Sequence, residues 1–122
     1  MKKGITLVAA MLALGLAQNA LASPKLEDMV GTWKWEGFTI KVQKCEKTGV
    51  CAEVISGPKN VGLQMIQSAL SSADSSFVGK VAHPQTGDTY NSKISMVNND
   101  TWHIDGCTAA NVCASGNFTR IK

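Results

Sequence analysis

Apolar and polar residues alternate along most of the chain beyond residue 30, and this alternation defines the predicted elements. Phe38, Ile40 and Val42 are separated by Thr39 and Lys41. A period of two places the first three side chains on one face, as in a half-buried β-strand. Strand candidates also lie at 31–37, 50–55, 77–82, 90–96, 102–104 and 114–121. Seven or eight strands joined mostly by hairpins favour a small antiparallel barrel or sandwich.

Two stretches depart from this period. Apolar residues in the segment 60–72 have the spacing of one helical face, namely Val61, Met65, Ile66, Ala69 and Leu70. This segment is therefore expected to be a short helix or an irregular flap. Residues 83–88 are a predicted turn, in which Pro84 starts the reversal and Gly87 is able to take a positive φ. Residues 23–30 have room for one helical turn before the first strand.

The first 22 residues have the composition of a secretory signal peptide. Two lysines precede an apolar run over residues 5–17, and the stretch ends in Ala-Leu-Ala at residues 20–22. The apolar run is short for a spanning helix. We therefore expect cleavage after Ala22 and a periplasmic or secreted protein that does not span the membrane. The remaining residues, 23–122, are expected to form one domain.

The net charge falls when this leader is set aside. The full chain has 12 basic and 9 acidic residues, and two of the lysines lie in the leader. Ten basic residues are then balanced by nine acidic ones. A nearly neutral domain with scattered lysines lacks the basic patch typical of nucleic-acid binding, so no nucleic-acid partner is expected.

All four cysteines lie in two heptads of the same outline, CEKTGVC at 45–51 and CTAANVC at 107–113. In an exported chain an even number of cysteines indicates disulfides, and three connectivities are open. Polar and turn-forming residues inside each heptad favour local pairing, Cys45 with Cys51 and Cys107 with Cys113. Five intervening residues match zinc-ligand spacing poorly, so no metal site is expected.

Residues near the two ends of the domain suggest a barrel. Gly31-Thr32-Trp33 resembles the Gly-x-Trp that begins the first strand of lipocalins. Arg120 resembles the arginine that those folds place across the tryptophan, a contact favoured by cation–π attraction. The resemblance implies a lipocalin-like barrel in which Trp33 and Arg120 close one end.

A more specific pattern covers nearly all of the chain after the leader. It runs from the Gly-x-Trp and the first cysteine pair to Gly79-Lys80, a Pro-x-x-Gly turn, Thr89-Tyr90 and a terminal Thr-Arg. This order resembles the bacterial exported family known as domain of unknown function 2147. Where that family typically reads Tyr-Asp before the proline, this chain has Ala82 and His83, so it is identified as a divergent member. The resemblance implies an exported, lipocalin-like β fold and brings no established chemistry.

Candidate catalytic and metal-binding groupings are few. His103, Asp105 and Cys107 alternate along one predicted strand and so share a face, opposite Trp102 and Ile104. Such a face suits a metal or proton-transfer site, but it suits equally a solvent-facing surface with a disulfide-bonded cysteine, which is the favoured interpretation. No serine lies in a nucleophile motif. We expect no enzymatic activity and no cofactor.

The functional hypothesis is a non-catalytic binding protein for a small, largely apolar ligand. The tentative ligand-binding residues are Phe38, Ile40, Tyr90 and Trp102, with the segment 60–76 as a lid or plug. The alternative is a cell-envelope protein-interaction module that has a filled core and acts through an exposed face. Large side chains in a small barrel serve either purpose, because the interior has little room to spare.

Overall fold

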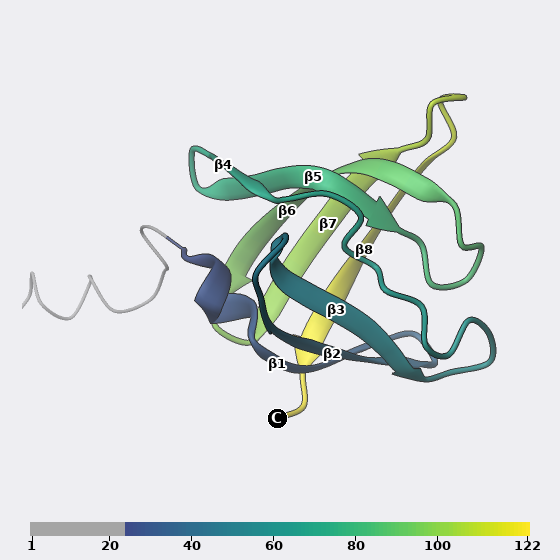
Figure 1. Cartoon of the computed structure of the whole chain (residues 1–122), viewed down its shortest axis with the longest axis horizontal. Coiled ribbons are helices and arrows are strands. Elements are labelled where there is room, and N and C mark those ends of the chain that lie inside the picture. Colours follow the sequence, from purple (N-terminus) through teal and green to yellow (C-terminus); the bar gives the residue numbers. More distant parts are fainter. Residues whose placement is uncertain (1–23) are drawn as a thin grey trace, which may run out of the picture.

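The computed structural model describes residues 24–122, and the predicted signal peptide therefore lies outside the described residues. A short 3-10 helix is followed by eight strands: η1 Leu26–Met29, β1 Gly31–Trp35, β2 Phe38–Cys45, β3 Gly49–Ser56, β4 Ser71–Ala73, β5 Ser76–Ala82, β6 Thr89–Asn98, β7 Thr101–Cys107 and β8 Cys113–Arg120. The strands form one antiparallel sheet in the order β3-β2-β1-β8-β7-β6-β5-β4. Figure 1 shows that this sheet curls into a half-barrel. The predicted mainly-β, antiparallel architecture is confirmed.

The alternation in the sequence becomes an inside and an outside of the sheet. In β2, Phe38, Ile40 and Val42 are buried, whereas Lys41 and Gln43 are exposed. β3 and β6 alternate in the same way. The inward side chains make one continuous hydrophobic core. Each large side chain buried there stabilises the fold by about 1.5–3 kcal/mol.

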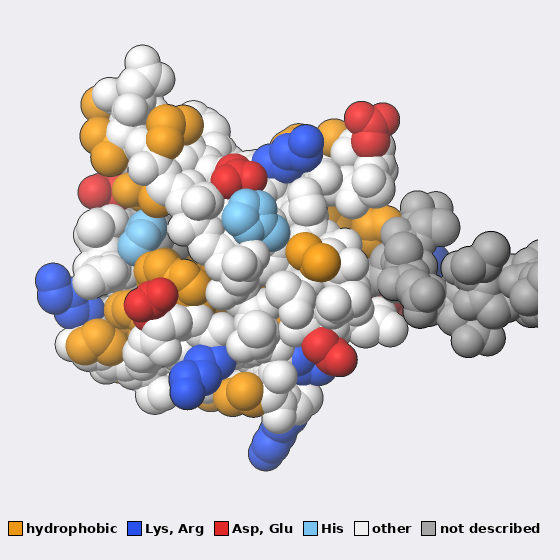
Figure 2. All heavy atoms as spheres, turned by 180° about the vertical axis from the view of Figure 1, so that it is seen from behind, with side chains coloured by type: hydrophobic (Ala, Val, Ile, Leu, Met, Phe, Trp, Pro, Cys, Tyr) orange, Lys and Arg blue, Asp and Glu red, His pale blue; other side chains and the backbone are white. Residues whose placement is uncertain are grey.

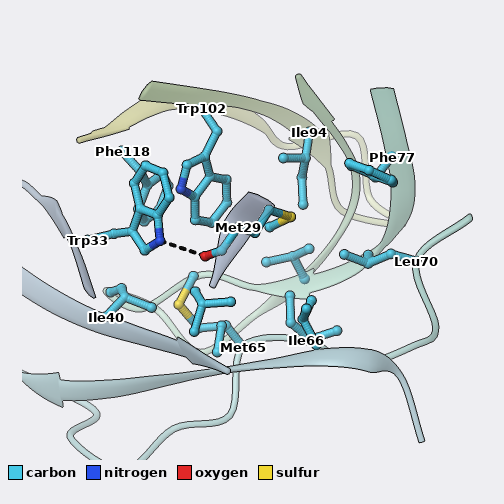
Figure 3. Packing of buried hydrophobic residues seen from close by; sticks show 14 of the residues in the cluster. Met29, Trp33, Ile40, Met65, Ile66, Leu70, Phe77, Ile94, Trp102 and Phe118 are labelled. Atoms are coloured by element: carbon cyan, nitrogen blue, oxygen red, sulfur yellow. Dashed lines mark hydrogen bonds between the residues drawn. The ribbon is translucent and has the colours of Figure 1, made fainter. Parts of the chain in front are cut away.

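One end of the half-barrel is closed by η1 and the start of β1. The indole N–H of Trp33 donates to the carbonyl of Met29 at 2.8 Å. Trp102 meets Trp33 edge to face, with 5.4 Å between the ring centroids. Figure 3 shows these three side chains together, with the hydrogen bond dashed. Met29, Trp33 and Trp102 are at most 1% exposed, so this end is closed to solvent.

Arg120 covers the same end from outside the core. Its guanidinium carbon lies 4.3 Å from the centroid of the Trp33 ring. The guanidinium also donates to the backbone carbonyls of Asp28, Val30 and Asn99 at 2.7–3.0 Å. One side chain thus joins the end of β8 to the segment before β1 and to the β6–β7 turn.

Both predicted disulfides are present with local pairing. Cys45–Cys51 joins β2 to β3, with Cα atoms 5.8 Å apart, and Cys107–Cys113 joins β7 to β8, with Cα atoms 4.0 Å apart. Loop-closure entropy gives about 2 kcal/mol for so short a ring. Figure 1 places η1 and the β7–β8 hairpin at opposite ends of the half-barrel, and the hairpin projects from the body. Each end of the domain therefore has one covalent clip.

The segment 60–70 is irregular and largely extended, so of the two expected alternatives the irregular segment is confirmed and the short helix is wrong. The Met65 N–H donates to the Ala52 carbonyl of β3 at 2.7 Å, and the Met65 carbonyl accepts from the Ala82 N–H of β5 at 2.7 Å. The segment therefore crosses between the two sides of the curled sheet and bonds to both. Its buried residues, Met65, Ile66 and Leu70, fill the core from an extended chain.

Candidate functional site

Side-chain size falls along the inner face as the sheet runs away from the closed end. The inward residues of β7 are, in order, Trp102, Ile104 and Gly106. Their partners on β8 are Phe118, Gly116 and Ala114. On the other side of β7, Gly106 pairs with Ser92 of β6. Three neighbouring strands thus present small residues at the same level, and the inner face is hollowed there.

This hollow is an apolar pocket of about 40 Å³. The small residues of its lining are Gly106, Ala114 and Gly116. The lining also includes Phe118 and Ile104, which pack in or against the hydrophobic core. The crossing segment adds Met65. Sites for drug-sized ligands are typically about 300–1,000 Å³, so this pocket takes the end of a molecule rather than the whole of one.

Aromatic rings form the wall of the pocket. Trp35 stacks on Phe38 and on Phe118, with centroid distances of 5.7 and 5.8 Å. Its ring also meets the imidazole of His83 edge to face at 5.2 Å, and His83 lies 5.5 Å from the ring of Tyr90. Aromatic contacts of this kind contribute about 0.5–1.5 kcal/mol beyond burial and fix the ring orientations.

His83 is held at the start of the predicted turn, which is confirmed over residues 83–88. Its N–H donates to the Asp88 carbonyl at 2.8 Å, and its carbonyl accepts from the Gly87 N–H at 2.7 Å. Its ring Nδ1 accepts from the backbone N–H of Gln85 at 3.1 Å. The neutral ring therefore carries its proton on Nε2.

The protonation state of His83 follows from its surroundings. Burial lowers the pKa of His83 below its ordinary value of 6.5, and attraction to the Asp88 carboxylate opposes this only in part. At neutral pH the pocket is thus lined by a neutral imidazole that offers Nε2–H as a donor.

The tentative ligand-binding residues are divided by the structure. Tyr90 lines the pocket. Phe38, Ile40 and Trp102 lie in the packed core with at most 2% exposure, and Phe38 reaches the pocket only through its stacking on Trp35. The four side chains therefore do not surround one space.

The outer face of β7 carries His103, Asp105 and Cys107, as the alternation predicted. His103 is hydrogen-bonded through Nδ1 to Asn117 at 2.7 Å, and its Nε2 lies 3.1 Å from a carboxylate oxygen of Asp105. The bond with Asn117, and then the contacts with Asp105, raise the pKa of His103. Cys107 is bound in its disulfide.

The described part of the chain offers little else for metal or nucleic-acid chemistry. Within residues 24–122, no group of three or more His, Cys, Asp or Glu side chains is placed to hold a metal ion. Figure 2, the view from behind, shows acidic and basic side chains interspersed rather than gathered by sign. None of the helices in this part has the length and hydropathy to cross a membrane.

Trp35, His83 and the inward glycines were not assigned to a site from the sequence. One signal was nevertheless present. Gly106 follows Ile104 by two residues, and Gly116 precedes Phe118 by two, so both glycines occupy inward positions of their strands. A glycine at an inward position indicates the close approach of a neighbouring group, and an added Cβ would lie 2.6 Å from the Ser92 hydroxyl at Gly106 and 2.6 Å from the Trp35 indole nitrogen at Gly116.

The fold and pocket define a class: a small antiparallel β-domain with two disulfides, of the kind found in oxidising compartments outside the cytoplasm. Residues 31–120 match the family described as "Uncharacterized protein conserved in bacteria (DUF2147)", and the chain belongs to that family. No curated protein and no solved structure matches the chain. The resemblance to this family is thus confirmed, whereas the likeness to lipocalins stays a prediction.

Proposed function

We propose that the protein is a non-catalytic periplasmic binding protein for a small, largely apolar ligand, which inserts one end into the pocket beside Trp35. The observation that carries the proposal is the lining, which consists mainly of apolar and aromatic groups on a floor of small residues. Moving apolar ligand surface into such a pocket is favourable by about 25 cal/mol per Å².

The polar groups of the lining support binding rather than catalysis. Among the described residues that line the pocket, none is Asp, Glu, Lys, Arg or Cys. The hydroxyl of Ser92 donates to the Tyr90 carbonyl at 3.0 Å. His83 accepts from the backbone of Gln85. Neither contact is the nucleophile–base pair on which covalent catalysis depends.

Location in the periplasm rests on the leader and the cross-links. Residues 1–22 have the signal-peptide pattern, and both disulfides require an oxidising compartment. Cleavage after Ala22 predicts a mature chain that begins at Ser23, which a mass spectrum of the exported protein measures.

A second candidate, the protein-interaction module, is favoured by one observation. The interior beside Trp33 and Trp102 is filled, while Ala109, Ala110 and Val112 are exposed on the projecting hairpin next to the pocket. A partner protein contacting that hairpin would bury the same apolar residues. This candidate predicts that substitutions at the hairpin tip weaken binding more than substitutions inside the pocket.

The test uses fluorobenzene as a neutral apolar probe, followed by ¹⁹F NMR. Ala114 lines the pocket at its exposed rim, and Ala114→Leu adds a larger side chain there, whereas Ala110→Leu adds the same side chain at the exposed hairpin tip as a matched control. We expect the wild type and Ala110→Leu to shift and broaden the probe signal equally, and Ala114→Leu to leave it unchanged. A probe signal unaffected by the wild-type protein would contradict the proposal.

A further inference from the structure

The polar groups of the lining are the indole N–H of Trp35, the imidazole of His83 and the hydroxyls of Tyr90, Ser92 and Ser115, and hydroxyls both donate and accept. Within residues 24–122, the indole N–H of Trp35 and the hydroxyl of Tyr90 take part in no side-chain hydrogen bond, unlike the indole of Trp33 and the hydroxyl of Ser92. The Trp35 Nε1 atom lies over Gly116, where an added Cβ would be 2.6 Å from it. Both residues line the pocket.

His83 adds a third donor of fixed position. Because Nδ1 accepts from Gln85, Nε2–H is the ring group left for a ligand. The ring is oriented by its contacts with Trp35 and Tyr90. Its lowered pKa keeps the ring uncharged at neutral pH, so it is compatible with an apolar ligand.

Donors without partners favour a ligand that brings an acceptor. An acceptor on the ligand would satisfy donors that a pure hydrocarbon leaves unpaired on leaving water, and such unpaired groups carry a cost. A cationic ligand is disfavoured, because no carboxylate lines the pocket among the described residues. The aromatic rings of Trp35, His83 and Tyr90 in the lining favour an aromatic ligand, because edge-to-face and offset ring contacts are both attractive.

We propose that the pocket selects a small aromatic compound with a neutral hydrogen-bond acceptor, such as a ketone or aldehyde oxygen, to which His83 and Tyr90 donate. This proposal rests on the proposed function, since it concerns the same pocket. It makes His83 and Tyr90 specificity-determining residues. It also gives a role to the histidine at a position where this chain departs from the family pattern.

The test compares acetophenone with α-methylstyrene. The two compounds have the same skeleton, but the carbonyl oxygen of acetophenone is a CH₂ group in α-methylstyrene, so only acetophenone offers an acceptor. Each compound competes with fluorobenzene for the pocket in the ¹⁹F experiment. We expect acetophenone to bind the wild type about fivefold more tightly, the ratio that one net hydrogen bond of about 1 kcal/mol gives. The variants His83→Phe and Tyr90→Phe should each reduce that ratio of affinities toward one, while their affinity for α-methylstyrene stays close to that of the wild type. His103→Phe, the same change on the outer face, should leave the ratio unchanged.

The outcomes separate this inference from the function on which it rests. If both compounds bind the wild type equally, the inference is overturned and the apolar binding protein stands. If the preference survives in both His83→Phe and Tyr90→Phe, these donors do not determine it, and the inference is again overturned. If fluorobenzene itself does not bind, the proposed function fails and the inference fails with it. Tyr90→Phe keeps the test valid should His83→Phe prevent folding.

Discussion

Arg120 combines a cation–π contact, several hydrogen bonds and an ion pair in one side chain. Its guanidinium lies on the Trp33 ring, donates to three backbone carbonyls, and has its Nε 3.3 Å from a carboxylate oxygen of Asp100. A lysine keeps the charge but loses the planar fork that makes these bonds together. The stability of the closed end of the half-barrel therefore depends on the guanidinium group of Arg120 and not on its positive charge alone.

Arg120→Lys is expected to destabilise the protein by about 2–4 kcal/mol, because several charge-assisted hydrogen bonds are lost at once. Urea unfolding followed by tryptophan fluorescence measures the change. Lys41→Ala, at an exposed position of β2, is the control and should stay within about 0.5 kcal/mol of the wild type. An Arg120→Lys protein as stable as this control would show that the contacts do not matter.

The two histidines are expected to titrate on opposite sides of their ordinary pKa of 6.5. Burial lowers the pKa of His83 in the folded state. The folded state therefore loses stability as the pH falls from 6.5 toward this lower pKa, because the unfolded chain takes up the proton first. The contacts with Asn117 and Asp105 raise the pKa of His103 in the folded state. Its contribution to stability is therefore present below pH 6.5 and is lost as the pH rises through the folded pKa. Imidazole ¹H chemical shifts recorded against pH measure both midpoints. A midpoint for His83 above that of His103 would contradict the assignment.

At the scale of elements, the crossing segment 60–70 decides how the half-barrel is completed. Its amides bond alternately to β3 and β5, with Met65 bonded to Ala52 and Gln67 to Lys80. A freely moving lid would lack these bonds. The segment is therefore described as a fixed connection between β3 and β5 beside the pocket, not as a mobile lid.

Hydrogen exchange tests this description. The amides of Met65, Gln67 and Ala82 should be protected to a similar degree as those of β2, because each donates to a backbone carbonyl at 2.7–2.8 Å. Val61, a residue that is 61% exposed and whose N–H donates to no backbone carbonyl among the turn and loop bonds of residues 24–122, provides an unprotected reference. Exchange of Met65 as rapid as that of Val61 would restore the interpretation as a lid.

Elements defined by local pattern were predictable from the sequence, whereas those defined by neighbours were not. The β2 strand and both disulfide-clipped hairpins depend on residues a few positions apart. The sequence left a short helix and an irregular flap open for this segment, because apolar residues spaced as on a helix also fill a core when an extended chain is flanked on both sides. The pocket depends on the register that sets Ser92, Gly106 and Ala114 side by side, and register across three strands cannot be read from one sequence.

At the scale of the whole molecule, the half-barrel has two unlike ends. Trp33 and Arg120 seal one end around large side chains. The other end has small inward residues, the exposed disulfide hairpin and the Trp35–His83–Tyr90 wall. A sealed end gives rigidity, and an open apolar end gives a place to bind. We propose that ligands enter only at this second end.

The most direct test of that claim is a ¹H–¹⁵N spectrum recorded during titration with fluorobenzene. The chain has three tryptophans, and their indole N–H signals report on two places: Trp33 and Trp102 in the core, and Trp35 at the pocket. We predict that the Trp35 indole signal and the amides of Gly106 and Gly116 shift progressively, while the indole signals of Trp33 and Trp102 stay in place. Shifts at Trp33 and Trp102 with none at Trp35, or no shifts at all, would contradict the account.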